Sequence, residues 1–322
     1  MNIPAYTELL NALRSIALLS STASVLGWDE RTMLPPKGIT HRAEQMANLA
    51  GMVHHRFTAP RIGDLLSELE SQQHDPASDL AVNVREIRRN YNRATKLPGS
   101  LVEALSRTAS LAEGAWVEAK QKSNYPLFRP WLDETLELKR QQAACLADGG
   151  DKYDALLDEF EPGAKAADIA RLFDEMRPRL VKLIQQIRNS GRVAPIEKLI
   201  GQYPIPAQEQ FSRFAAEKVG FDFAAGRLDV SAHPFCTDLG PGDVRITTRY
   251  DETDFTGSFF GVLHETGHGL YSQGLPAEHY GTPRGEAISL GIHESQSRLW
   301  ENFVGRSVSF WTFMLPHARR LF

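Results

Sequence analysis

FTGSFFGVLHETGHGL, residues 255–270, is apolar enough to form a buried helix, and it carries two histidines. His264 and His268 are four residues apart, so on a helix they lie on one face, one turn apart, and both imidazoles can reach the same metal ion. Glu265 follows the first histidine, where it can act on a water molecule as general base instead of binding the metal. This H-E-x-x-H spacing is typical of zinc peptidases.

A catalytic zinc site usually takes three protein ligands and leaves a fourth position for water. The predicted third ligand is Glu294, which 25 residues separate from His268. The adjacent His293 is the alternative, and it would give a three-histidine site. Glu294 falls in a predicted helix over 283–303 whose inner side is expected to carry apolar residues, namely Ile288, Ile292, Leu299 and Phe303. We therefore expect one divalent ion per chain, zinc or alternatively cobalt, on His264, His268 and Glu294.

The simplest structural alternative treats the two histidines as core residues and Glu294 as a surface carboxylate. The presence of Glu265 inside an apolar helix, with a suitably spaced acid downstream, favours the metal site. Gly267 and Gly269 are poor helix residues, so we expect a neighbouring backbone or a substrate to pack closely against them.

A period-two pattern precedes this helix. In 243–250 the residues Val244, Ile246, Thr248 and Tyr250 alternate with Asp243, Arg245, Thr247 and Arg249, which predicts a strand with one polar face. Leu228 and Val230 suggest a second short strand, with a turn at 240–242, so a small sheet is expected within 226–250. Arg245 and Thr247 lie on the predicted polar face and are candidates for contact with an extended substrate backbone; a solvated face is the alternative.

Most of the remaining chain has helical periodicity. Predicted helices cover 6–17, 79–94, 100–123, 130–147, 169–187 and 207–219, with a kink or restart expected at Pro178 and a stop at Gly220. We therefore expect a mainly α fold of the zincin-like metallopeptidase type, with a small sheet beside the active-site helix. We expect one domain over 1–322: a helical region 1–220, the sheet, and metal-site helices at 255–272 and 283–303.

Composition narrows the function classes. The 322 residues carry 36 Lys+Arg against 40 Asp+Glu, a net charge of −4, which argues against a nucleic-acid partner. No uninterrupted apolar stretch approaches the roughly 20 residues that span a bilayer, so no membrane partner is expected. Cys145 and Cys236 cannot build a disulfide framework and are expected to be free thiols. A cytoplasmic location is predicted.

Several ordered segments give the sequence a family resemblance. The segments HPF (233–235), DVRIT (243–247), HETGH (264–268) and HESQ (293–296), with YDALLDEFEPG (153–163) upstream, resemble signatures of the thermostable, Taq-type metallocarboxypeptidases. The resemblance implies an almost all-helical fold with a narrow cleft, a homodimer, and removal of single residues from peptide C-termini. It also implies His264, His268 and Glu294 as metal ligands and Glu265 as general base. The family pattern further implies His233 as a residue of the cleft; a turn histidine held by Pro234 is the alternative.

The resemblance covers the whole chain but only the front part of the family pattern. The family's Ile-Arg-x-x-Ala-Asp and Gly-Tyr-x-x-Thr-Tyr-x-x-Gly motifs do not occur here. By the resemblance, they supply an arginine for the substrate carboxylate and a tyrosine near the reacting carbonyl. We therefore expect a complete metal site, an incomplete substrate site and reduced carboxypeptidase activity. The alternatives are a zinc endopeptidase and a non-catalytic zinc-binding or assembly protein.

Overall fold

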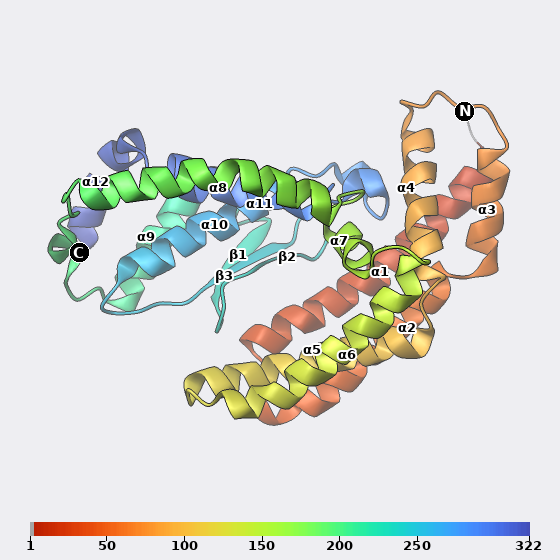
Figure 1. Ribbon diagram of the computed structural model, residues 1–322, viewed down its shortest axis with the longest axis horizontal. Coiled ribbons are helices and arrows are strands. Elements are labelled where there is room, and N and C mark those ends of the chain that lie inside the picture. The colour runs from red at the N-terminus through yellow and green to blue at the C-terminus, as the bar shows by residue number, and fades with distance from the viewer. Residues whose placement is uncertain (1–2) are drawn as a thin grey trace.

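The structure is a computed structural model that describes residues 3–322. It is mostly helical with one small sheet, which confirms the predicted fold class. In Figure 1 the earlier helices, coloured red to yellow, form one group, and the later helices, green to blue, lie with the sheet in another. Short 3₁₀ turns lie in the connections, at Pro36–Gly38, Ile196–Leu199, Ala277–His279 and Pro283–Gly285.

The early group is held together by its own apolar core. Leu9 and Leu13 pack against Leu65, Leu66 and Ile87 of two later helices, and all five side chains are buried. The helices are α1 (Pro4–Thr32), α2 (Ile39–Phe57), α3 (Pro60–Glu70), α4 (Asp79–Ala94), α5 (Gly99–Gln121) and α6 (Tyr125–Ala147). The first, third and fourth meet in this core, while α2 packs on α5, and α5 on α6.

Two features of this group differ from the sequence expectation. Helix α6 begins at Tyr125 and runs through Pro130, where the sequence predicted a start. Helix α1 is long and apolar enough, by length and composition, to cross a membrane, which the sequence analysis did not recognise. In the structure Ala5, Leu9 and Leu13 of this helix pack in the core just described.

A short segment connects the two groups. Helix α7 (Lys152–Phe160) carries Asp158, whose Oδ2 lies 2.6 Å from Nη1 of Arg93 on α4 and also pairs with Arg89. Burial alone would raise the pKa of Asp158, but a hydrogen bond from the Gly163 backbone N–H and the two guanidinium groups hold it below its usual range. Asp158 therefore links α7 to α4 of the early group through two ion pairs.

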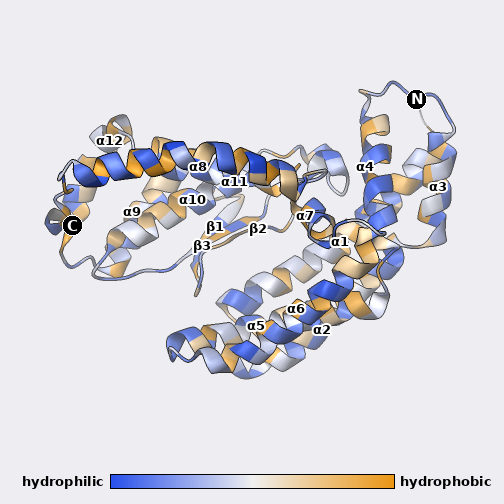
Figure 2. Ribbon diagram, in the orientation of Figure 1, coloured by the Kyte–Doolittle hydropathy of each residue, from blue (hydrophilic) through white to orange (hydrophobic). Residues whose placement is uncertain are grey.

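Helix α8 (Ala166–Asn189) follows and lies along the outside of the late group (Figure 1). It passes through Pro178 as one helix, so the predicted restart does not occur. None of its residues is buried, and Figure 2 shows apolar and polar residues interleaved along it. Its exposed apolar side chains are Leu172, Phe173, Met176, Leu180, Val181, Leu183, Ile184 and Ile187.

The sheet has three strands in the order β1-β3-β2. Strand β1 (Gly226–Val230) runs parallel to β3 (Val244–Thr248), and β2 (Cys236–Asp238) runs antiparallel to it. The sequence predicted the first and third strands but missed β2, which is only three residues long. The predicted turn at 240–242 therefore joins β2 to β3, and Gly242 has the left-handed φ of +85° that suits glycine there.

The late helices bury an aromatic core behind the sheet. Helices α9 (Ile205–Lys218), α10 (Phe255–Gln273) and α12 (Val308–Leu321) meet around Phe211, Phe259, Leu263 and Met314. The rings of Phe211 and Phe259 stack with centroids 4.7 Å apart. The apolar side of 255–270 that the sequence identified thus anchors α10 and leaves its other side for the histidines.

The last predicted helix, 283–303, is wrong in its start and its orientation. Helix α11 covers only Leu290–Arg298, and a π-helical turn follows at Leu299–Val304. Ile288 and Phe303, expected on the inner side, are 70% and 76% exposed, and Ile292 and Leu299 are exposed as well. The inner side instead carries Ser297, which is 0% exposed, so a small polar residue rather than an apolar stripe faces α10.

Candidate metal centre

Helix α10 is fixed at its start by polar contacts. The side chain of Asp254 accepts a hydrogen bond from the Thr256 backbone N–H and caps the helix. Further on, Ser258 donates to Oε1 of buried Gln208 at 2.6 Å, and the Gln208 amide donates to the carbonyl of Asp251 at 2.7 Å. This buried network sets the position and rotation of the helix before its histidines are reached.

The histidine rings lie one turn apart on α10, as the spacing predicts. Their centroids are 5.0 Å apart. Helix α11 crosses at this point, and Ser289 caps it by accepting from the Ile292 backbone N–H. A Cβ built on Gly267 would lie 2.5 Å from the Gln296 carbonyl oxygen, so the two helix backbones are in contact here. The predicted close packing at Gly267 is present.

This contact brings Glu294 to the histidines. Its Oε2 lies 3.3 Å from Nε2 of His268 and 3.7 Å from Nε2 of His264. One ligand atom from each of the three residues lies within 4.8 Å of the others. The adjacent His293 instead stacks its ring on His268, with centroids 4.5 Å apart. The structure therefore brings together the three predicted ligands and places the alternative beside them.

The chemistry of these donors fits a divalent cation. Burial, followed by the neighbouring rings of His293 and His264, lowers the pKa of His268 to about 4, so its ring is neutral and offers a lone pair at pH 7. Its Nδ1 is buried and has no hydrogen-bond partner among residues 3–322. Two histidines and one glutamate are a usual ligand set for catalytic zinc.

Glu265 lies beside this cluster and is only 6% exposed. Burial, with smaller contributions from Glu294 and Glu301, raises the pKa of its carboxyl to about 8. It lines a cavity of about 700 Å³ together with the following residues: Leu199, His233, Pro234, Thr256, Gly257, Phe260, Gly261, His264, Glu294, Arg298, Glu301 and Arg306. A ligand in this cavity would touch the carboxylate and two of the three candidate metal ligands.

Of the three predicted cleft residues, one lines this cavity. His233 is exposed on its wall and meets Trp116 edge to face, with centroids 6.3 Å apart. Arg245 turns away: it pairs with Asp243 at 2.7 Å, and its guanidinium lies 4.3 Å from the ring centroid of Trp28. The polar face predicted for β3 is therefore not open to a substrate at this residue.

Thr247 also differs from the prediction. It is 0% exposed, and its hydroxyl accepts from the Phe235 backbone N–H at 2.9 Å and bonds to Ser231 at 2.7 Å. The alternation of the strand was correct, but the loop before β2 covers the polar face. Thr247 thus holds that loop, including the neighbouring His233, instead of facing a substrate.

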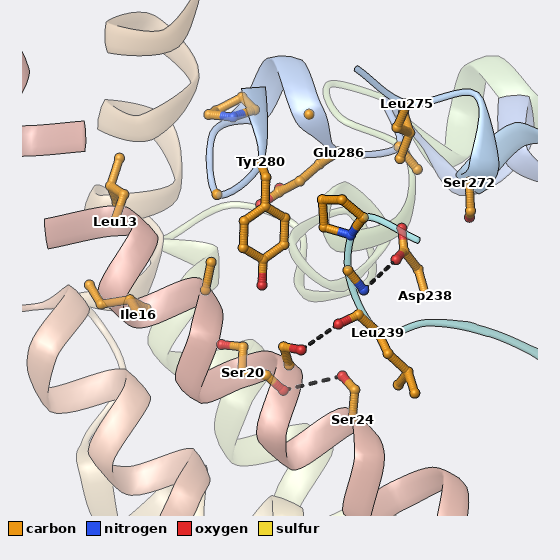
Figure 3. Close-up of a pocket in the computed structure, with 18 of the residues that line it drawn as sticks. Leu13, Ile16, Ser20, Ser24, Asp238, Leu239, Ser272, Leu275, Tyr280 and Glu286 are labelled. Carbon is orange, nitrogen blue, oxygen red and sulfur yellow. Dashed lines mark hydrogen bonds between the residues drawn. The ribbon is translucent and has the colours of Figure 1, made fainter. Parts of the chain in front are cut away.

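A second cavity, of about 460 Å³, lies between α1 and the loops around the sheet. Figure 3 shows Ser20 and Ser24 on α1 facing Leu239, Tyr280 and Glu286 across it. Ser21 donates to the Leu239 carbonyl and closes one end. His293 lines this cavity while stacking on His268, so it stands between the cavity and the metal cluster.

Sequence reasoning missed Glu301, which belongs to the centre. Its Oε2 accepts from Nδ1 of His264 at 2.9 Å, and both of its oxygens contact arginines, Arg298 and Arg306. Burial alone would raise the pKa of Glu301, but the hydrogen bonds from His264 and Arg306 outweigh it and lower the pKa. Glu301 follows Glu294 by seven residues, which is two helical turns. This spacing could have indicated from the sequence that both acids lie on the same face.

The chain is similar to known proteins of one metallopeptidase family. Residues 8–322 match the model of the carboxypeptidase Taq (M32) metallopeptidase family. The chain is 47% identical to thermostable carboxypeptidase 1 of Thermus thermophilus, over 99% of this chain and 64% of that protein. It is 36% identical to carboxypeptidase 1 of Bacillus subtilis, over 100% of this chain and 64% of that protein.

A solved structure gives the same result. The crystal structure of a carboxypeptidase of this family from Deinococcus radiodurans matches with a TM-score of 0.86 at 36% identity, over 99% of this chain and 64% of that one. The chain thus spans about 64% of the length of the curated relatives it matches.

The backbone contact at Gly267 generates a prediction. Gly267→Ala should lower the free energy of unfolding by about 1–3 kcal/mol, because the added methyl group forces α10 and α11 apart. Gly261→Ala is the matched control on the same helix, since its Cβ would meet nothing closer than 3.7 Å. The control should be neutral or stabilised by up to about 1 kcal/mol. Denaturant unfolding of both variants measures the difference, and equal stabilities would show that the helices are not in contact.

Proposed function

The chain belongs to the carboxypeptidase Taq (M32) metallopeptidase family, and on that premise we propose that it is a zinc-dependent hydrolase that removes C-terminal residues from peptides. The observation that carries the proposal is the convergence of His264, His268 and Glu294 next to buried Glu265. The curated relatives are named carboxypeptidases, and the same residue types and spacing are those of zinc peptidases.

Each residue of the centre has a role in this proposal. His264, His268 and Glu294 would hold the zinc ion, which when bound polarises the scissile carbonyl and makes water more acidic. Glu265 takes a proton from the attacking water and donates it to the amine that leaves. Because Glu265 lines the cavity wall, it can meet a substrate there without binding the metal.

Substrate contact is proposed for His233 alone of the three residues predicted for the cleft. It lines the metal cavity and also a neighbouring cavity of about 890 Å³ that includes Trp116 and Trp131. A peptide whose scissile bond lies at Glu265 could therefore extend past His233 towards these aromatic rings.

A cytoplasmic location and a homodimer complete the proposal. Cys145 and Cys236 are free thiols, as in a reducing compartment. The apolar side chains along α8 are exposed together and form a stripe, which supports burial against a second copy of the chain.

The first prediction of this proposal concerns the third ligand. Glu294→Ala should weaken zinc binding by more than about 100-fold, because a three-ligand site tolerates ligand loss badly. This loss exceeds that expected for removing a residue that only hydrogen-bonds to a ligand. His293→Ala is the matched control: it removes a neighbouring ring that stacks on His268 and should change the affinity far less. Competition with a chelating indicator measures both constants. The reverse order of effects would move the third ligand to His293.

The second prediction separates base from ligand. Glu265→Gln removes the proton acceptor but no ligand, so bound zinc should persist while hydrolysis falls by about 10²-fold or more. Zinc content and the time course of residues released from a peptide are measured on the same sample. Stepwise loss from the C-terminus supports a carboxypeptidase, and internal cuts support an endopeptidase. Unchanged turnover in the variant would exclude Glu265 as the base.

The third prediction tests the dimer. Leu180→Lys with Ile184→Lys places two charges in the exposed stripe of α8 and should shift the chain to monomer, because the charges would be buried between copies. Gln185→Lys with Gln186→Lys adds the same charge to the polar side of the same helix and should leave association unchanged. Sedimentation velocity at several concentrations gives the result, and a monomeric wild-type chain would contradict the proposal.

A further inference from the structure

Glu301 contacts the metal centre from behind one of its histidines. Its Oε2 lies 2.9 Å from Nδ1 of His264, the ring nitrogen that does not face Glu294. Nε2 of the same ring lies 3.7 Å from Glu294, so one imidazole stands between two carboxylates. The Glu301 side chain is 16% exposed, which shields this hydrogen bond from water and strengthens it.

The π-helical turn places Glu301 there. Glu294 and Glu301 are seven residues apart and lie on the same side of the helical segment, one reaching the front of His264 and the other its back. The turn ends where the Gly305 backbone N–H donates to the Trp300 carbonyl at 2.8 Å, and the Trp311 indole donates to the Gly305 carbonyl at 2.8 Å. These bonds anchor the turn to α12, independently of the metal centre.

Two arginines fix the Glu301 carboxylate further. Arg298 donates to Oε1 of Glu294 at 2.9 Å and to Oε2 of Glu301 at 3.2 Å, and so bridges both acids. Arg306 donates to Oε1 of Glu301 at 3.3 Å. With both oxygens held by arginines, the carboxylate keeps one lone pair directed at His264.

We propose that Glu301 is a positioning residue that holds His264 as the Nδ1–H tautomer, with the Nε2 lone pair directed at the metal site. A carboxylate that accepts the second N–H of a histidine ligand fixes the ring orientation and raises its basicity. The proposal rests on the proposed function, because it takes His264 as a ligand. It also makes the two histidines unequal, since Nδ1 of His268 has no carboxylate partner within residues 3–322.

The experiment must distinguish this positioning role of Glu301 from a purely structural one. Glu301 could serve only as a counter-charge for Arg298 and Arg306. In that case Glu301→Gln and Glu301→Ala would have equal effects, because both remove the charge. If Glu301 acts on His264, the Gln carbonyl still accepts from Nδ1–H, and Glu301→Gln should retain more of the function than Glu301→Ala.

The first measurement is the affinity for Zn²⁺ alone, by competition with a chelating indicator. Glu301→Ala should bind zinc about 10- to 100-fold more weakly than the wild type, the range for loss of such an outer partner, and Glu301→Gln should fall between them. Asn302→Ala is the matched control, because it removes a contact to Arg306 from the same turn but none to His264. Equal affinities for wild type and Glu301→Ala, or equal losses in the Gln and Ala variants, would overturn the proposal.

The second measurement uses metal-free protein with ¹⁵N-labelled histidine. At mildly alkaline pH, NMR should show His264 as the Nδ1–H tautomer in the wild type and in Asn302→Ala. In Glu301→Ala this preference for the Nδ1–H tautomer should be lost. An unchanged tautomer in Glu301→Ala would overturn the proposal. Because no metal is present, this result stands even if the wild type binds no zinc, an outcome that would reject the proposed function separately. Circular dichroism of each variant confirms that it is folded.

Discussion

The backbone contact between α10 and α11 at Gly267 is the constraint on which the metal centre depends. A side chain at this position would collide with the backbone at Gln296 and Ser297, and Ser297 itself is fully buried. Because the helices are this close, the carboxylate of Glu294 reaches both histidines, although its side chain is still 38% exposed. A wider separation would leave His264 and His268 as a pair one turn apart with no third donor.

The rest of the molecule holds these two helices in place. The apolar side of α10 packs with α9 and α12 through Phe211, Phe259 and Met314, and its start is tied by Gln208. Helix α11 is held from the other direction, where Oε2 of Glu161 accepts a hydrogen bond from the Gly291 backbone N–H at 3.0 Å. Glu161 follows α7, and α7 is bound to the early helices through Asp158. The segment 153–163 therefore connects the early helices to the helix that carries the third candidate ligand.

The three acids of the centre differ in their charged neighbours. Three acids, Glu265, Glu294 and Glu301, surround two histidines, and such a group would repel itself if it were all ionised and unpaired. Arg298 and Arg306 offset this for the two acids of the α11 segment, while Glu265 is buried away from both arginines. The unequal surroundings act on the pKa in opposite directions: hydrogen bonds from His264 and Arg306 lower the pKa of Glu301, whereas burial raises the pKa of Glu265 to about 8.

The spacing of residues within single helices and strands was enough to predict many features of this protein. The four-residue spacing of His264 and His268, the apolar run around them and the alternation in 243–250 each express the geometry of a single element, which the sequence order fixes directly. The early helices followed for the same reason, with α4 predicted at its observed ends. Only the tertiary structure decided the starting point and rotation of α11, the burial of Thr247 and the contact of Glu301 with His264. Those features depend on which elements pack against one another. The inner face of α11 carries Ser297 and carboxylates instead of apolar residues, so hydrophobic periodicity could not predict how this helix packs.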